Sequence, residues 1–359
     1  MNKTDKKDLL SLYPDELVAL VLSLGEPKYR ANQIFTQIHK GISPDNITNI
    51  GKETKRKLAE ASYFYLPTVR LKLVSKIDGT VKYLFELSDG NTVESVVMKY
   101  KHGNTICVSS QVGCRMGCAF CASTIGGKVR DLSASEILGQ ILAAQNDIGE
   151  RISNIVMMGI GEPLDNYDNV IRFLRLVGDE NGLNIGYRHI SLSTCGLVDK
   201  IDRLAKEAFP ITLSISLHAS NDETRGSIMP VNKKWSIDAL LDACLRYYTT
   251  TKRRISFEYT LIAGKNDSKD SALELAELLN KKLRPKFQKD SFPIHVNLIP
   301  VNPVNETGFS ASDKAATEKF AATLEQKGIR ATVRRKLGPD INASCGQLRR
   351  QHKKEENEQ

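Results

Sequence analysis

Short apolar runs alternate with segments of helical spacing from residue 104 to residue 336, and this alternation limits the folds open to the chain. The segments between the runs begin with capping signals, at Ser133 with Glu136, Asp168, Ser236, Ser268, and either Ser310 or Ser312. Strands that alternate with helices of this length form βαβ units. The pattern predicts an α/β fold with a parallel sheet, open or closed into a barrel. The predicted strands are 105–110, 152–160, 189–194, 211–218, 255–262, 294–300 and 329–334.

A glycine-punctuated segment with three cysteines follows the first predicted strand. Cys114, Cys118 and Cys121 have the spacing C-x3-C-x2-C. Gly113 and Gly117 favour a loop over a helix, because glycine inside a helix costs about 1 kcal/mol relative to alanine. Thiolates held in such a loop select soft metals, namely zinc, copper(I) or an iron–sulfur cluster.

The number of cysteines separates these possibilities. A structural zinc site closes with four ligands, usually as two pairs. The other cysteines stand singly in the sequence, as Cys107, Cys195, Cys244 and Cys345. Four thiolates would also complete a closed [4Fe–4S] cluster, so three favour a cluster with one iron left open for a ligand. Buried structural thiols are the alternative interpretation.

Polar residues follow several predicted strands at the point where each strand ends. They are Gly161 and Glu162, Ser193 and Thr194, Ser216 with Leu217 and His218, and Asn302. The carboxyl ends of parallel strands are where barrels and open α/β sheets build their active sites. The cysteine segment follows a strand in the same way, so we expect the cluster and its ligand to share one mouth.

Different patterns flank the alternating region. Residues 15–62 have helical spacing, and their basic residues form either a solvated face or a grip on a phosphate backbone. Residues 69–109 alternate with period two between Asp-Gly turns, which predicts an antiparallel meander. We predict four parts: a helical accessory, RNA-binding domain (1–65), a β-meander region (66–103), the barrel (104–336) and a C-terminal loop with a charged tail (337–359).

Net charge and hydropathy limit the kinds of partner that the chain can have. The 51 basic and 42 acidic residues give a net charge of +9, which suggests a polyanionic partner. The first ten residues are charged where a signal peptide would be apolar. No apolar run approaches the roughly 18 residues of a membrane span. These features predict a cytoplasmic protein without a membrane partner.

Several further motifs follow one another along the chain. They are VESVVMKY, CVSSQVGCRMGCAFCAST, MMGIGEPLDNYDNV, SLSTCGLV, SLHASND, IMPVNK, VNLIPVNP and GPDINASCGQLR. The cysteine spacing by itself resembles that of the radical S-adenosylmethionine (SAM) enzymes as a whole. The motifs together, taken in order, resemble those of one family among them, the ribosomal RNA adenine-C2 methyltransferases.

The resemblance implies a partial (βα)6 barrel with a small N-terminal helical domain and a short meander. It implies a [4Fe–4S] cluster on Cys114, Cys118 and Cys121, with SAM on the open iron. The remaining contacts to SAM would come from Gly161, Glu162, Ser193, Ser216, Leu217, His218 and Asn302. The implied partners are ribosomal RNA, with transfer RNA as a further candidate, and an electron donor such as flavodoxin. The protein is expected to act as a monomer.

The resemblance also implies a mechanism. One SAM would methylate Cys345, and a second would generate the radical that activates this methyl group for addition to C2 of adenine. Glu94 would accept the C2 proton. Cys107 would then attack the sulfur of Cys345, forming a disulfide and releasing the RNA.

Without the resemblance these residues have plainer interpretations. Cys345 is a lone thiol on a loop, and Cys107 is a small hydrophobe in an apolar strand. Glu94 is a solvated residue of a hairpin strand, and His218 is a structural histidine.

Three other functions stay open from the sequence. The first is a C8-specific methyltransferase of the same family, although Pro163 after Gly161-Glu162 favours the C2 group. The second is a radical SAM enzyme with another substrate. The third is a zinc-dependent RNA-binding protein without enzyme activity.

Overall fold

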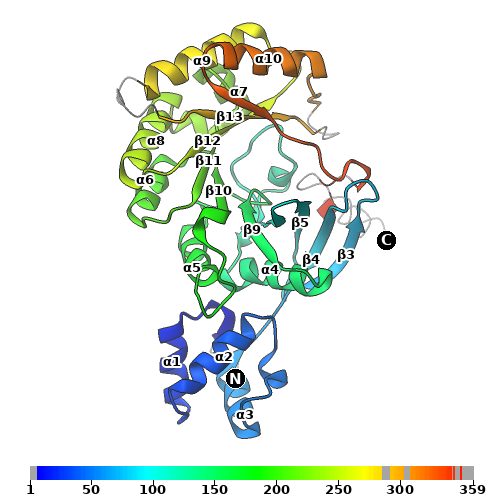
Figure 1. Ribbon diagram of the computed structural model, residues 1–359, viewed down its shortest axis with the longest axis vertical. Coiled ribbons are helices and arrows are strands. Elements are labelled where there is room, and N and C mark those ends of the chain that lie inside the picture. Colours follow the sequence, from blue (N-terminus) through cyan, green and yellow to red (C-terminus); the bar gives the residue numbers. More distant parts are fainter. Residues whose placement is uncertain (1–5, 285–291, 303–307, 342, 344–347, 350–359) are drawn as a thin grey trace.

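One curved sheet of ten strands organises the molecule (Figure 1). The computed structural model describes residues 6–284, 292–302, 308–341, 343 and 348–349. The strand order is β14-β13-β12-β11-β10-β9-β6-β5-β4-β3. Strands β6 and β9 to β14 pair in parallel, and β3 to β6 pair in an antiparallel manner. The bounds are β3 Thr68–Val74, β4 Val81–Glu86, β5 Thr92–Tyr100, β6 Gly103–Cys107, β9 Ile152–Met157, β10 Ile190–Thr194, β11 Thr212–Ser216, β12 Ile255–Leu261, β13 His295–Pro300 and β14 Arg330–Val333.

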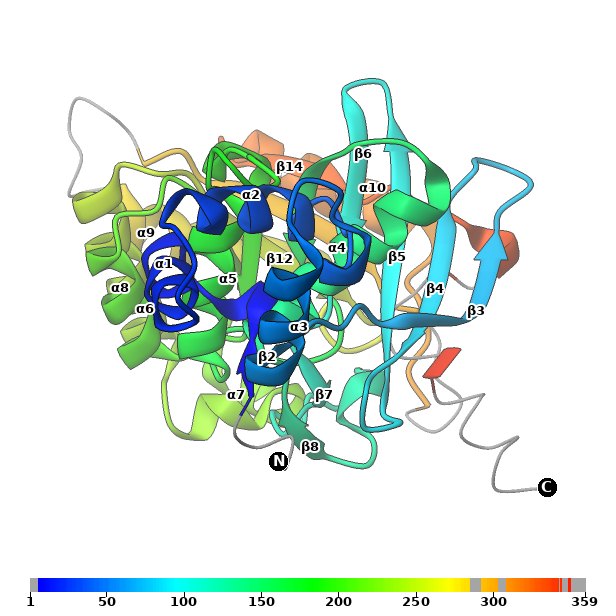
Figure 2. The same cartoon turned by 90° about the horizontal axis from the view of Figure 1, so that it is seen from below.

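Helices connect the parallel strands and lie on the outside of the curved sheet (Figure 1). Six strand–helix units followed by β14 give the predicted partial (βα)6 barrel. Figure 2 shows the same barrel from below, behind the N-terminal helices. The bounds of the helices are α4 Ala134–Ile148, α5 Tyr167–Val177, α6 Val198–Lys206, α7 Asp222–Ile228, α8 Ile237–Thr251, α9 Lys269–Leu283 and α10 Lys314–Gln326.

Most of the capping signals mark the helix starts. Ser133 and Glu136 form the capping box of α4, and Ser236 and Ser268 cap α8 and α9. Two of these predictions were wrong. The N-cap of α5 is Asn166 rather than Asp168, which lies in the first turn of the helix. The N-cap of α10 is Asp313 rather than Ser310 or Ser312. Asp313 accepts from the backbone N–H of Ala316, whereas the hydroxyl of Ser312 donates to Asp267.

The meander is part of the barrel sheet rather than a separate element. Strand β6 pairs with β5 on one side and with β9 on the other. Its turns are the predicted ones, with Gly79 and Gly90 at positive φ. One face of the meander packs on α4, where Tyr83 donates to Asp147 and Ser95 donates to Gln140.

The N-terminal segment is the predicted set of helices, α1 Pro14–Ser23, α2 Tyr29–Ile38 and α3 Lys52–Ala61. Two short strands, β1 Lys7–Asp8 and β2 Ser62–Tyr63, pair in parallel where this module joins the barrel. Arg172 on α5 binds both carboxylate oxygens of Glu16 and lies over the ring of Tyr13. The module is thus fixed to the outer helices, at the opposite end of the molecule from α10 (Figure 1).

The C-terminal segment crosses to the meander (Figure 1). Asp340 accepts from the hydroxyl of Ser75 and from the backbone N–H of Lys76, and Gly338 donates to Asp78. Cys345 lies outside the described residues. Within the described part of the chain, no helix has both the length and the apolar character to cross a membrane.

Candidate functional site

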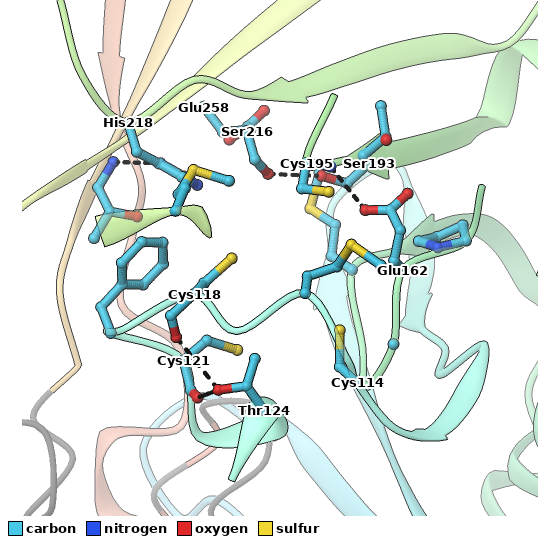
Figure 3. Close-up of a pocket in the computed structure, with 18 of the residues that line it drawn as sticks. Cys114, Cys118, Cys121, Thr124, Glu162, Ser193, Cys195, Ser216, His218 and Glu258 are labelled. Carbon is cyan, nitrogen blue, oxygen red and sulfur yellow. Dashed lines mark hydrogen bonds between the residues drawn. The ribbon is translucent and has the colours of Figure 1, made fainter. Parts of the chain in front are cut away.

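A pocket opens at the carboxyl ends of the parallel strands, where the sequence predicts the active site. Its cavity volume is about 210 Å³. Figure 3 shows the three cysteines on one side and Glu162, Ser193 and Ser216 on the other. Many of the lining residues come from the cysteine loop and the strand ends, among them Cys114, Cys118, Cys121, Gly161, Glu162, Ser193, Thr194, Cys195, Ser216, His218, Glu258 and Arg334.

The cysteine segment is a loop, as its glycines predict. It begins in β7 Gln111–Gly113 and returns through β8 Lys128–Asp131. Gly113 and Gly117 have φ of 79° and 71°. A Cβ atom on Gly113 would lie 2.0 Å from the carbonyl oxygen of Gly127, so this crossing of the loop requires glycine.

The three thiols suit a cationic cluster. Burial raises the pKa of Cys114 to about 12, and burial also raises the pKa of Cys118. Without a cation these thiols would stay protonated, whereas coordination to a metal deprotonates them. Among the described residues, no three His, Cys, Asp or Glu side chains form a site for one metal ion. All three cysteines line the pocket, and in Figure 3 their sulfurs face one space, which fits a multi-iron cluster.

Glu162 places a buried carboxylate in the pocket. Its oxygens accept from the backbone N–H groups of Cys195 at 2.7 Å and Leu164 at 3.0 Å. Burial raises the pKa of Glu162 in spite of these donors. Gly161 precedes it at φ 111°, where an added Cβ would lie 2.7 Å from the side chain of Gln111.

The predicted residues of β10 and β11 meet in the same pocket. The hydroxyls of Ser193 and Ser216 lie 3.5 Å apart. The Nδ1 atom of His218 accepts from the backbone N–H of Thr260 at 2.9 Å, which leaves the proton on Nε2. Burial lowers the pKa of His218 to about 3, so the ring is a neutral donor rather than a proton carrier.

Two of the predicted cofactor residues do not line the pocket. The side chain of Leu217 is fully buried in the core, and Leu217 contributes a carbonyl oxygen that accepts from Arg225. Asn302 follows β13, whose Ile299 does line the pocket.

Sequence reasoning missed Glu258 as a pocket residue. It lies in β12, is 4% exposed and accepts from Asn297 at 2.7 Å. Burial raises the pKa of Glu258. The available signal was a carboxylate inside the apolar run 255–262, because a charged side chain is buried only where it has a hydrogen-bonding or charged partner.

Arg225 connects the ends of β10 and β11. Its guanidinium is fully buried and donates to the carbonyl oxygens of Leu217, Cys195 and Ser216. One side chain thereby fixes the backbone after β10 against the backbone after β11.

Glu94 and Cys107 lie on the meander side, on one face of the sheet. Val96 is opposite Cys107, and Cys107 is opposite Val156, so these residues and Glu94 share a face. Met158, which lines the pocket, packs in the same cluster as Cys107. This face is continuous with the pocket wall.

The C-terminal segment covers that face. Leu337 and Ala343 pack on Val96 and Cys107, so both strand residues are buried. Glu94 is 2% exposed, and the expectation of a solvated residue was wrong, because a segment more than two hundred residues away in sequence covers it.

Comparison with known proteins decides the family. Residues 108–279 match the radical SAM superfamily, and residues 7–63 match the ribosomal RNA large subunit methyltransferase N-terminal domain. The probable dual-specificity RNA methyltransferase RlmN of Clostridium novyi is 53% identical over 96% of this chain and 98% of its own length. That of Alkaliphilus oremlandii is 53% identical over 97% and 99%. The chain belongs to the RlmN family.

A solved relative confirms the RlmN-type architecture. The crystal structure of a radical SAM methyltransferase from Sphaerobacter thermophilus aligns with a TM-score of 0.88 and 41% identity, over 95% of this chain and 98% of that one. The partial barrel and the methyltransferase class predicted from the sequence are confirmed. So are a [4Fe–4S] cluster and SAM, the cofactors of this superfamily, and the zinc alternative is wrong.

Proposed function

We propose that this chain methylates C2 of an adenine in 23S ribosomal RNA, at the family target position 2503, and of adenine 37 in transfer RNA. The names of the relatives support an RNA substrate with dual specificity. Pro163 after Gly161 and Glu162 supports C2 over C8. The enzyme would act in the cytoplasm as a monomer, with a donor such as flavodoxin supplying electrons.

The observation that carries the proposal is the position of the described residues on either side of Cys345. Before it, Ala343 packs in the cluster that contains Cys107. After it, the backbone N–H of Arg349 donates to Glu94 at 2.7 Å. Both described flanks thus contact the face that carries Cys107 and Glu94, and this face leads into the pocket.

The pocket residues would hold the cofactors. Cys114, Cys118 and Cys121 would bind three irons, and Glu162 would accept from the amino group of SAM. The remaining contacts to SAM would come from the hydroxyls of Ser193 and Ser216, the Nε2–H of His218, the backbone at Gly161 and Leu217, and Asn302. Of these, Leu217 and Asn302 lie outside the lining of the pocket. When bound, the cluster and SAM supply the methyl group and the radical chemistry that an electron-poor ring carbon requires.

The remaining steps belong to the protein. The sulfur of Cys345 would carry the methyl carbon to C2, and the carboxylate of Glu94 would take the C2 proton. Attack of the Cys107 sulfur on that of Cys345 would form an S–S bond. The electron pair of the broken S–C bond would stay on the carbon, where a proton completes the methyl group.

We also propose the four-part division of the chain. The helical module 1–65 would bind RNA, and 66–103 would extend the sheet of barrel 104–336. The segment 337–359 would bring the methyl carrier to the pocket. The match of residues 7–63 to a separate family domain supports the first boundary.

Cysteine variants test the mechanism. We expect Cys345→Ala to bind SAM and lose methylation, and Cys107→Ala to accumulate a covalent protein–RNA adduct. Cys244→Ala is the matched control, because Cys244 is fully buried in α8, outside the lining of the pocket. Undiminished methylation by Cys345→Ala would refute the carrier role.

Mass mapping of the product nucleoside tests regiochemistry and substrate. We expect 2-methyladenosine in both RNAs. A methyl group at C8 would replace the proposal with the C8 enzyme. Methylation of neither RNA by the reconstituted iron–sulfur protein would indicate a different substrate.

A further inference from the structure

The buried ion pair between Lys82 and Glu94 lies beside the proposed methyl-transfer face. The Nζ atom of Lys82 lies 3.1 Å from Oε2 of Glu94, and both side chains are at most 2% exposed. Lys82 is opposite Val96 on β4–β5, and Glu94 is opposite Leu84, so the pair is a diagonal contact across the strands. Burial of a lysine at this depth is unusual, and it requires a paired charge.

The second oxygen of Glu94 makes a contact of another kind. Oε1 accepts from the backbone N–H of Arg349, 255 residues away in sequence. Arg349 and Leu348 are themselves buried. A single carboxylate thus joins a fixed cation on the meander to the backbone of the C-terminal segment.

We propose that Lys82 is a positioning residue that acts through Glu94 and anchors the C-terminal segment at Arg349. Lys82 holds one carboxylate oxygen, which fixes the orientation of the other toward the Arg349 amide. The inference rests on the proposed function only for the consequence to catalysis. Where Glu94 is the proton acceptor, Lys82 sets the position of that acceptor and of the segment beside it.

Hydrogen exchange at Arg349 tests the anchor without RNA. In the enzyme with its iron–sulfur cluster and SAM bound, we expect Lys82→Met to speed hydrogen exchange of the Arg349 amide by about tenfold or more. Lys82→Arg, which keeps the charge, should stay within about threefold of the native rate. Lys99→Met is the matched control, because the Lys99–Glu150 pair is half-exposed on the same meander. An unchanged Arg349 amide in Lys82→Met overturns the proposal.

A double-variant comparison tests whether Lys82 acts through Glu94. In a Glu94→Gln background, Lys82→Met should add nothing to the exchange rate, because the contact it supports is already altered. Additive effects would overturn the proposal. Should Lys82→Met not fold, Lys82→Gln retains a donor without charge and is judged by the same criteria.

The adduct formed with RNA gives the catalytic readout. In a single turnover, we expect Lys82→Met to slow the decay of the protein–RNA adduct by at least about tenfold, with recovery in Lys82→Arg. If Cys345 is active and the protein–RNA adduct of Lys82→Met decays at the native rate, the positioning role is refuted and the proposed function is intact. Loss of the adduct in every protein, native included, refutes the proposed function instead.

Discussion

At Gly161 the wall of the pocket packs tightly against the start of the cysteine loop. It has φ 111°, and a Cβ at this position would lie 2.7 Å from the Cβ of Gln111 and 2.8 Å from its backbone nitrogen. The backbone nitrogen cannot move without displacing β7. The glycine therefore allows Glu162 and the cluster cysteines to share one small volume.

We expect Gly161→Ala to destabilise the fold by roughly 2–3 kcal/mol, because the substitution combines backbone strain with overpacking. Denaturant unfolding measures this change. Gly226→Ala is the control, since Gly226 lies in α7 with its nearest atom 3.9 Å from an added Cβ. Equal stability of the two variants would contradict the argument.

At the level of single residues, the sequence identified the side chains that gather at strand ends. Glu162, Ser193, Ser216 and the cysteines could be predicted, because period and turn signals locate the ends of parallel strands. For Glu258, the carboxylate within an apolar run signals a buried partner, but only the closed barrel shows that the side chain faces the pocket.

At the level of elements, Arg225 connects the ends of β10 and β11, which are neighbours in the sheet. Its donors reach carbonyl oxygens after β10 and at the end of β11. A planar fork of donors suits this task, and an ammonium does not. The positions of Ser193 and Ser216 follow from this connection.

We expect Arg225→Met to cost roughly 2–4 kcal/mol in unfolding free energy and to weaken SAM binding, because buried carbonyl oxygens lose their donors. Arg225→Lys should recover little of either. Arg246→Met provides the comparison, since its pair with Asp202 is on the surface and worth under about 1 kcal/mol. Recovery of SAM affinity by Arg225→Lys would show that charge, not geometry, is what matters.

The local sequence pattern predicts the strands and turns of the sheet but not all the contacts between distant segments. Each strand and hairpin turn follows from period and from Asp-Gly signals, as in the meander around Gly79 and Gly90. The parallel pairing of β6 with β9 follows from the βαβ pattern, but the contact of the C-terminal segment with this sheet joins distant segments, and nothing in either of them specifies it. For the same reason, the burial of Glu94 was not foreseen.

At the level of the whole molecule, the N-terminal module lies at one end and α10 lies at the other (Figure 1). Some basic residues of the module already have acidic partners, as Arg56 has Glu53 and Glu60, and Lys57 has Glu26. Exposed lysines such as Lys28, Lys40 and Lys52 are better placed to contact phosphates.

We expect substitution of Lys28, Lys40 and Lys52 by glutamine to weaken RNA binding and to flatten its salt dependence. Each lost phosphate contact lowers the slope of log K against log salt by about 0.7–0.9. A titration at several salt concentrations measures the slope. Glutamines at Lys314, Lys319 and Lys327, exposed on or just after α10, should leave it unchanged. Equal effects of the two triples would argue against the module as the RNA contact.

Buried histidines make stability depend on pH. His39 is 1% exposed, stacks on Phe35, and burial lowers its pKa to about 4. Between pH 6.5 and 4 the unfolded chain binds a proton at this ring that the folded chain does not, so stability falls as pH falls. The contribution lost at pH 5 is about 2 kcal/mol.

We expect His39→Phe to lose about 2 kcal/mol less stability than the native chain between pH 7 and pH 5. Denaturant unfolding at the two pH values measures this difference. The exposed His102, replaced in the same way, should leave the dependence unchanged. If the free energy of unfolding declined equally in the native chain and in His39→Phe, another group would be responsible for the loss of stability at low pH.

The hydrogen bond between Asp340 and Ser75, 265 residues apart, has a consequence for biosynthesis. A nascent chain is made from the N-terminus, and domains begin to fold as they emerge. Every barrel strand precedes the segment that covers Glu94 and Cys107. This face therefore stays open to solvent until the segment that contains Leu337 and Ala343 has been made.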